Sequence, residues 1–175
     1  MNVHEAFDLI KTDRILLDKR VTHWADLGCG TGLFTQALSR MLQPDSTIHG
    51  IDNNSSLRRQ TTPNGVEIIP LRLDFVTVDW GLQDLDGIIM ANSLHYVKDQ
   101  VSFLQKIKTY LKPEAYILIV EYDTDTPVPT WVPYPLSFSS LTNLFIHAGY
   151  TSLQKLSERP SIYGSGYIYG ALALP

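Results

Sequence analysis

A glycine-rich turn after a short apolar run is the feature that most constrains this chain. Residues 21–27 have the composition of a buried strand, and Gly28, Gly30 and Gly32 follow at every second position. Glycine accepts the left-handed backbone conformation, lets a backbone approach a ligand closely, and here precedes a predicted helix N-terminus. The alternative is that the glycines serve only a tight strand-to-helix turn. Three alternating glycines favour a nucleotide-type ligand instead.

The rest of the chain alternates strand-like and helix-like segments. Apolar spacing predicts helices over the first dozen residues and over 33–42, 101–111 and 141–148. Apolar runs predict strands at 21–27, 47–51, 66–71, 85–91, 116–122, 152–157 and 167–174. We therefore expect an α/β fold, a three-layer sandwich around a mostly parallel central sheet of about seven strands. No helix separates the last two strands, so we expect the last strand to be antiparallel.

Composition narrows the class of protein. The 175 residues suffice for a single domain, in which an N-terminal helical cap (1–20) precedes a ligand-binding part (21–175). Fourteen basic and 18 acidic residues give a net charge of −4, which disfavours a nucleic-acid surface. We expect no nucleic-acid partner.

Cysteine and histidine usage restricts the chemistry further. Cys29 is the single cysteine, which fits a reducing compartment. No apolar run approaches the roughly 20 residues of a membrane span, so we expect a cytoplasmic protein without a membrane partner. No two histidines have the spacing of a metal-binding pair, and we expect no metal site. The histidines are His4, His23, His49, His95 and His147.

The glycine spacing and a nearby carboxylate separate two kinds of nucleotide ligand. A dinucleotide fingerprint reads G-x-G-x-x-G, whereas the third glycine here, Gly32, comes one residue early. Asp26 stands just before the turn. Its charge would repel a pyrophosphate and attract a ligand that carries an ammonium group.

Two later carboxylates also follow predicted strands. Asp52 comes about twenty residues after the turn, where a carboxylate can accept hydrogen bonds from both hydroxyls of a ribose. An exposed loop aspartate is the alternative. Asp74 and Phe75 combine an acceptor with an apolar wall, which suits an adenine ring, although the same composition is common in loops.

These segments together resemble the class I S-adenosylmethionine-dependent methyltransferases, which have a Rossmann-like fold. The resemblance rests on residues 25–32, 50–52, 73–75, 85–96 and 111–121, and it extends over 20–175. It implies that the cofactor is S-adenosyl-L-methionine and that residues 21–175 form the methyltransferase domain. It places the methionine part of the cofactor on the glycine turn and Asn92 beside the methyl group. The expected cofactor-binding residues are Asp26, Gly28, Cys29, Gly30, Gly32, Asp52, Asn53, Asp74, Phe75 and Asn92.

A sulfonium is an activated methyl donor, so the protein needs chiefly to align acceptor and methyl. If the acceptor is an amine or hydroxyl, a base can assist proton loss, and His95 is our candidate because it closely follows a strand. Local packing of that histidine is the alternative. Tyr96 borders the acceptor or belongs to the core.

A proline-rich segment, residues 126–135, is the most unusual part of the chain. Its four prolines exclude a central strand. Trp131 and Tyr134, with Phe138, form an aromatic wall over an acceptor or else pack a stiff crossover onto the body. Three tyrosines near the C-terminus are better explained by the core or an interface, and these are Tyr163, Tyr167 and Tyr169.

The sequence thus favours methyl transfer to a small-molecule acceptor by direct in-line displacement. The Asp/Asn-Pro-Pro-Tyr signature of amino-methylating nucleic-acid enzymes is absent, since residues 91–94 read Ala-Asn-Ser-Leu. One alternative is a non-catalytic S-adenosylmethionine-binding module or partner-dependent subunit, because the chain has little room for a substrate lid. The other is an NAD-dependent oxidoreductase, which the glycine spacing disfavours. The oligomeric state, monomer or homodimer, stays open.

Overall fold

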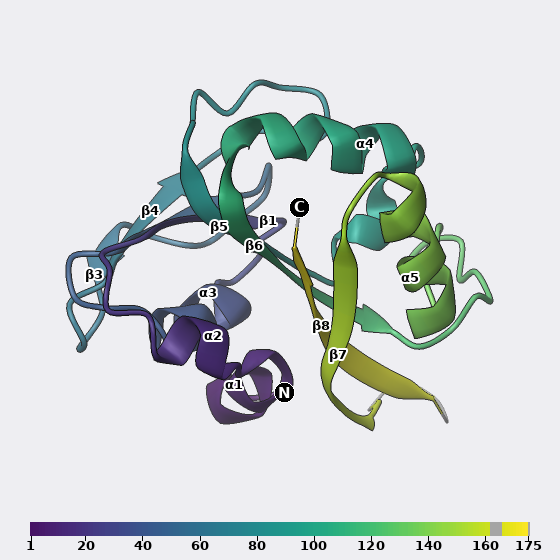
Figure 1. Cartoon of the computed structure of the whole chain (residues 1–175), viewed down its shortest axis with the longest axis horizontal. Helices are drawn as coiled ribbons and strands as arrows, with labels where there is room; N and C mark the ends of the chain where they lie inside the picture. Colours follow the sequence, from purple (N-terminus) through teal and green to yellow (C-terminus); the bar gives the residue numbers. More distant parts are fainter. Residues whose placement is uncertain (162–165, 175) are drawn as a thin grey trace.

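An eight-stranded sheet forms the centre of the protein (Figure 1). The computed structural model describes residues 1–161 and 166–174. The strands lie in the order β3-β4-β2-β1-β5-β6-β8-β7. They span β1 (His23–Leu27), β2 (Thr47–Ile51), β3 (Gln60–Thr61), β4 (Glu67–Leu71), β5 (Leu85–Ala91), β6 (Leu111–Tyr122), β7 (Ser152–Pro160) and β8 (Tyr167–Leu174). Tyr163, which the sequence groups with other tyrosines, lies outside the described residues.

Five neighbouring strands are parallel, from β4 through β2, β1 and β5 to β6. The last strand, β8, is antiparallel to both β6 and β7, which confirms the predicted direction. The strand beyond the seven predicted ones is β3, a two-residue strand antiparallel to β4. It was not predicted because two exposed polar residues carry no apolar pattern.

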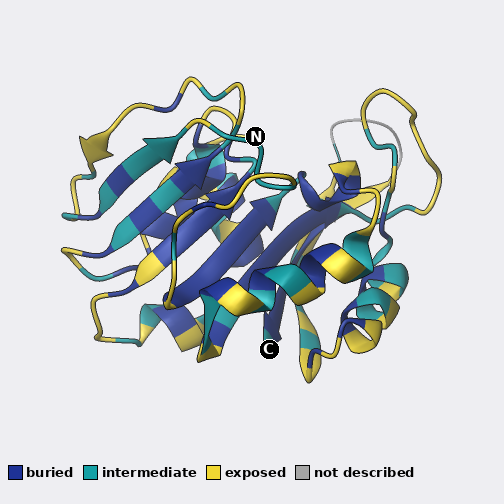
Figure 2. Ribbon diagram, turned by 90° about the horizontal axis from the view of Figure 1, so that it is seen from above, coloured by how far each residue is buried: buried dark blue, intermediate teal, exposed yellow. Residues whose placement is uncertain are grey.

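Helices cover both faces of the sheet and make the predicted three layers (Figure 1). One face carries α1, α2 and α3, and their apolar residues form one core cluster with Trp24, Leu118 and Val120. The other face carries α4 and α5 over a second cluster. In Figure 2 the central strands are almost entirely buried. The helices are α1 (Val3–Ile10), α2 (Asp13–Leu16), α3 (Leu33–Ser39), η1 (Leu94–Tyr96), α4 (Gln100–Ile107), η2 (Lys108–Tyr110) and α5 (Phe138–His147).

Two connections between parallel strands contain no helix, contrary to a strict alternation. Between β2 and β4 the chain forms β3 and the turn at residues 62–65. Between β4 and β5 it forms a loop closed by Trp80, whose ring stacks on Tyr110 at 4.1 Å and whose Nε1 donates to the Phe75 carbonyl. The buried indole provides the apolar contact that a helix face would otherwise supply.

The N-terminal segment is packed into the body. Asn2 and Glu5 form a reciprocal capping box at the start of α1, and Glu5 is paired with Arg159 of β7 at 2.7 Å. Gly170 of β8 permits the close approach, because a Cβ there would lie 1.8 Å from the Leu9 carbonyl oxygen. The predicted cap therefore covers a sheet face. Among the described residues, no helix has the length and apolar character to cross a membrane.

Candidate functional site

The predicted site residues gather along one edge of the sheet. Adjacent parallel strands β2, β1, β5 and β6 all end there, because their carboxyl ends point the same way. The glycine turn follows β1, Asp52 follows β2, and Asn92 follows β5. This is the edge at which open α/β sheets bind ligands.

All three glycines of the turn have left-handed backbones, with φ of 77° at Gly28, 52° at Gly30 and 85° at Gly32. The turn is anchored by the Ile51 carbonyl, which accepts from the Gly28 amide at 2.7 Å. A Cβ on Gly28 would lie 2.5 Å from the Ser93 Cβ, whereas nothing stands within 4 Å of one on Gly30. The turn is therefore packed at its start and open at its middle.

Asp26 is buried beneath the turn with a neutral partner. The Thr35 hydroxyl of α3 donates to its carboxylate at 2.5 Å. Burial raises the pKa of Asp26 to about 7, the Thr35 hydrogen bond opposes that rise, and the charge of Asp52 adds to it. Burial likewise raises the pKa of Cys29 to about 12. The thiol therefore stays protonated and is not a nucleophile.

Asp52 holds the turn from the end of β2. Its carboxylate accepts from the Gly30 amide at 3.0 Å and from the Asn54 amide at 2.7 Å. The neighbouring Asn53 is exposed, and its carbonyl accepts from Arg72. Asp52 is half-buried, so it can also accept bonds from a ligand at the turn.

Asp74 and Phe75 differ in how free they are. Asp74 accepts from the Val76 amide and the Thr77 hydroxyl, both at 2.9 Å, and so closes its own turn. The ring of Phe75 reaches the glycine turn, where a Cβ on Gly28 would lie 3.4 Å from it. The structure therefore brings the phenylalanine ring, more directly than the carboxylate, to the site.

Asn92 has two unusual features. Its φ is 54°, a left-handed conformation in a residue other than glycine, while its amide donates to the Val120 carbonyl at 2.8 Å. Its side-chain oxygen Oδ1 is buried and has no hydrogen-bond partner among the described residues. A strained backbone and an unpartnered acceptor are typical of a ligand contact.

His95 and Glu121 form a buried pair behind Asn92. The ring nitrogen Nδ1 of His95 lies 2.6 Å from Glu121 Oε2, and the His95 amide donates to Oε1 at 3.2 Å. The side chains are only 2% and 1% exposed. Among the described residues Nε2 has no partner, and it is not one of the two fully buried unpartnered atoms, His49 Nδ1 and Asn92 Oδ1. Nε2 is therefore the ring nitrogen of His95 that the described protein leaves unpaired.

Glu121 was missed by the sequence interpretation. A signal was present, because Glu121 is a lone carboxylate near the end of the most apolar predicted strand. An acid in such a strand needs a buried partner. Its partner, His95, is 26 residues away in η1, which follows the neighbouring strand β5.

The proline-rich segment forms an exposed loop after β6. Trp131 is 71% exposed, Tyr134 39% and, on the adjacent η1, Tyr96 53%. Phe138 is half-buried and packs edge-to-face on Tyr169 at 5.5 Å. The described structure thus exposes two of the three predicted wall residues and directs Phe138 to the interior.

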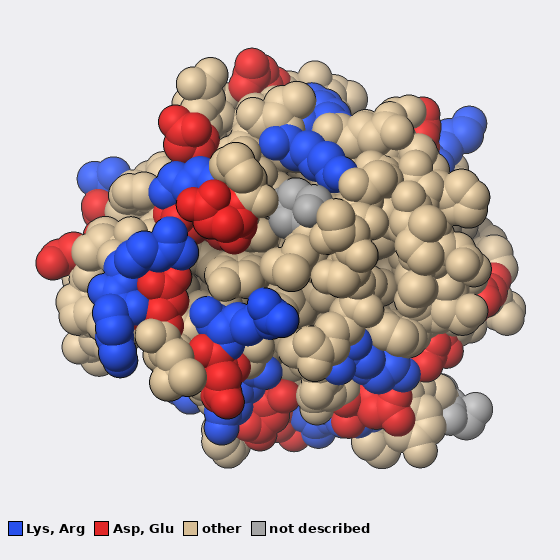
Figure 3. Space-filling model, viewed as in Figure 1, with Lys and Arg blue, Asp and Glu red and all other residues tan. Residues whose placement is uncertain are grey.

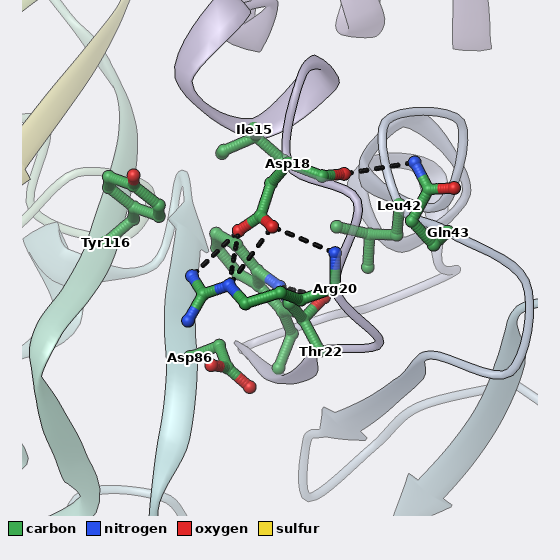
Figure 4. A pocket seen from close by; sticks show the side chains of 9 residues that line it. Ile15, Asp18, Arg20, Thr22, Leu42, Gln43, Asp86 and Tyr116 are labelled. Carbon is green, nitrogen blue, oxygen red and sulfur yellow. Dashed lines mark hydrogen bonds and ion pairs between the residues drawn. The ribbon is translucent and has the colours of Figure 1, made fainter.

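Two hollows lie at the opposite, amino-terminal edge of the strands. Figure 4 shows the first, a cavity of ≈ 10 Å³ beside the ion pair of Asp18 and Arg20, with room for about one water molecule. The second, of ≈ 490 Å³, lies between the end of α3 and the turn before β4, and includes Arg40 and Asn64. Neither contains a predicted site residue.

Charged groups give little indication of a polyanionic or metal ligand. On the face in Figure 3, acidic and basic side chains are intermixed, and the part over α5 is largely uncharged. Within the part of the chain that the structure describes, no three His, Cys, Asp or Glu side chains are grouped as a metal site requires.

Comparison with known proteins places this geometry in a family. The family described as "Methyltransferase domain" matches residues 25–117, more than half of the chain. No curated protein matches the sequence. Many solved structures share the fold.

Three of these structures illustrate the likeness. A Nostoc punctiforme protein described as an O-methyltransferase has 20% identity and a TM-score of 0.68, over 99% of this chain and 56% of that one. An Aquifex aeolicus SAM-dependent methyltransferase has 19% identity and a TM-score of 0.61, over 99% and 98%. The Burkholderia thailandensis 1,6-didemethyltoxoflavin-N1-methyltransferase, with bound S-adenosylhomocysteine, has 17% identity and a TM-score of 0.66, over 98% and 76%.

At these identities the structures show the shared fold, and the chain spans only about half of the Nostoc protein. The matched region contains the glycine turn, both strand-end carboxylates and Asn92. The chain therefore belongs to the methyltransferase domain family.

Proposed function

We propose that this protein transfers a methyl group to a small-molecule acceptor by direct in-line displacement. The observation that carries the proposal is the convergence at one sheet edge of the open glycine turn, the Asp52 carboxylate and the unpartnered Asn92 Oδ1. A nucleoside with an amino-acid tail matches this set of acceptors, because it presents ribose hydroxyls and an ammonium group. A dinucleotide does not, because its pyrophosphate would face Asp26.

The residues take distinct roles toward the cofactor in this proposal. Asp52 accepts from the ribose hydroxyls, and Asp26 attracts the ammonium group through the turn. Phe75 forms an apolar wall for adenine, and Asp74 has lone pairs left for its amine. Asn92 uses Oδ1 beside the methionine part. The other proposed contacts are Gly28, Cys29, Gly30, Gly32 and Asn53.

When bound, S-adenosylmethionine supplies a methyl group on a positively charged sulfur, and displacement leaves the bonding pair on that sulfur. His95 then acts on the acceptor proton. Glu121 accepts from Nδ1, which leaves a lone pair on Nε2, the ring nitrogen without a partner among the described residues. Nε2 takes the proton that the acceptor hydroxyl or amine loses as it gains the methyl group. Glu121 stabilises the imidazolium that results.

Several observations support a small acceptor. The Burkholderia neighbour is named for 1,6-didemethyltoxoflavin, which is bound in its structure, and the face in Figure 3 shows no extended basic patch. A single cysteine that is buried and not in a disulfide, Cys29, is compatible with the reducing cytoplasm.

Isothermal calorimetry with S-adenosylmethionine, S-adenosylhomocysteine and NAD tests the proposal. We expect binding of both sulfur ligands, weakened by about 1.5–3 kcal/mol in Asp52→Asn, the scale of a hydrogen bond to a charged group. Asp79→Asn, an exposed loop variant, is the control and should leave the affinity unchanged. NAD binding without a response to either sulfur ligand would contradict the proposal. Tight cofactor binding with no methyl transfer to a broad acceptor panel would identify a non-catalytic module.

A further inference from the structure

An exposed aromatic surface stands beside the His95–Glu121 pair. We define it by Tyr96, Val128, Trp131 and Tyr134, each of which is at least 39% exposed. The exposure of Trp131 is exceptional in this chain, since Trp24 and Trp80 are 1% and 4% exposed. Leaving large aromatic side chains in water is unfavourable unless they contact something in function.

The surface has a defined shape because its loop is held at both ends. Asp123 accepts from the Phe138 amide at 2.8 Å, and Asp125 accepts from the Ser137 amide at 3.0 Å. At the tip, Val128 and Val132 exchange two backbone hydrogen bonds, of 3.0 and 2.7 Å. Prolines fix φ in between. Figure 2 shows this loop as an exposed excursion beyond the sheet.

Backbone contacts place the aromatic surface next to the His95–Glu121 pair. The Tyr134 amide donates to the His95 carbonyl at 3.0 Å, and Gln100 Nε2 donates to the Tyr134 carbonyl at 3.0 Å. The rings of His95 and Tyr96 lie 4.4 Å apart, centroid to centroid. A molecule on the aromatic surface is therefore adjacent to the residue that would receive its proton.

The chemistry of the surface selects its ligand. Residues 126–136 contain no charged side chain. A charged ligand placed there would lose hydration without compensation, whereas a flat apolar ring stacks on exposed aromatic faces. We propose, resting on the function proposed above, that the acceptor is an uncharged planar aromatic molecule with a hydroxyl or ring N–H. Its ring stacks on Trp131 and Tyr134, and its reactive group faces His95.

A macromolecular partner fits the surface less well. A stable protein interface uses about 20–30 residues on each side, whereas the aromatic surface consists of four side chains on one loop and η1.

Calorimetry with 2-naphthol and its saturated analogue 2-decalol, each with saturating S-adenosylhomocysteine, tests the proposal. We expect saturable 2-naphthol binding, at least tenfold tighter than that of 2-decalol. Trp131→Ala and Tyr134→Ala should each weaken it about tenfold while leaving S-adenosylhomocysteine affinity unchanged. Leu17→Ala, which truncates an exposed apolar side chain at the opposite edge, should change neither.

The outcomes separate this proposal from the proposed function. Equal affinity for the two alcohols, or unchanged 2-naphthol affinity in both loop variants, would overturn the aromatic acceptor while cofactor binding persists. If the unmodified protein does not bind S-adenosylhomocysteine, the proposed function itself is overturned. Sedimentation that shows a dimer dissociated by Trp131→Ala would assign the surface to a second copy of the chain and overturn the aromatic acceptor.

Discussion

The carboxylates at the two edges of the sheet have different kinds of partner. At the amino-terminal edge, Asp18 is paired with Arg20 and Asp86 with Lys112, both at 2.8 Å. At the carboxyl edge, Asp26 is bonded by the Thr35 hydroxyl and has no cationic partner among the described residues. The Arg20 hydrogen bond lowers the pKa of Asp18, whereas burial raises that of Asp26 to about 7.

This difference indicates which edge the fold completes by itself. The amino-terminal edge neutralises its charges with its own cations, so it needs no ligand. Within the described part of the chain, the carboxyl edge has a carboxylate without a cation in Asp26, an amide oxygen without a donor in Asn92 and three left-handed glycines. A ligand with an ammonium group and hydroxyls would supply the missing partners.

The largest expected effect concerns Glu121, which we place as a positioning residue for His95. Glu121→Gln keeps the shape of the pair and removes the charge that stabilises the imidazolium. We expect kcat to fall on the order of 10²-fold with KM unchanged, the lower range for proton transfer by a positioned group.

A purely structural role for Glu121 predicts a different result. Tyr169→Phe, which removes a buried hydrogen bond to the Leu136 carbonyl on the same side of the sheet, is the matched control. If Glu121→Gln and Tyr169→Phe lowered stability and kcat alike, the positioning role would be wrong. Recovery of part of kcat in Glu121→Asp would support it.

A smaller effect concerns Asp26 and pH. Its folded pKa, about 7, lies above the ordinary value of 3.8, so the stability it contributes is complete below pH 3.8 and is lost as pH rises through 7. Between pH 5 and 6 the cofactor-free protein should lose about 1.4 kcal/mol of unfolding free energy. Asp26→Asn should abolish that slope in urea unfolding.

Asp18 provides the contrast at the other edge. Its pKa is lowered, so its stabilisation is present above pH 3.8 and is lost only as pH falls through the lowered value. Asp18→Asn should therefore leave the slope between pH 5 and 6 unchanged. A slope that persists in Asp26→Asn would show that another group carries it.

The sequence predicted those parts of the fold that follow from burial of apolar runs. The predicted strand bounds at 47–51, 85–91 and 167–174 coincide with β2, β5 and β8, and most residues of each of these strands are buried. The glycine turn was also recognisable, since alternating glycines after a strand have few structural alternatives. The two-residue β3 and the helix-free connections were not predicted, because polar loops contain no periodic signal.

The less predictable part of the site depends on pairing between distant segments. His95 and Glu121 meet only because β5 and β6 are neighbours in register, and Thr35 reaches Asp26 only because α3 packs behind β1. The backbone N–H of Asn92 likewise donates a hydrogen bond to the Val120 carbonyl on β6, and this contact holds the left-handed φ of Asn92. Such contacts follow from strand order, which local composition does not encode.

The smallest expected effect is at Arg20, and it sharpens the comparison from the other side. Arg20 is half-exposed, so its pair with Asp18 contributes at most about 1 kcal/mol, screened further by salt. Arg20→Gln should therefore cost less than about 1 kcal/mol in urea unfolding and leave S-adenosylmethionine affinity unchanged in calorimetry. A weakened cofactor affinity would mean that the two edges are coupled. Because the sheet strands run continuously between them, that result would require the amino-terminal ion pairs to position the carboxyl edge, and the division between a self-sufficient edge and a ligand-binding edge would fail.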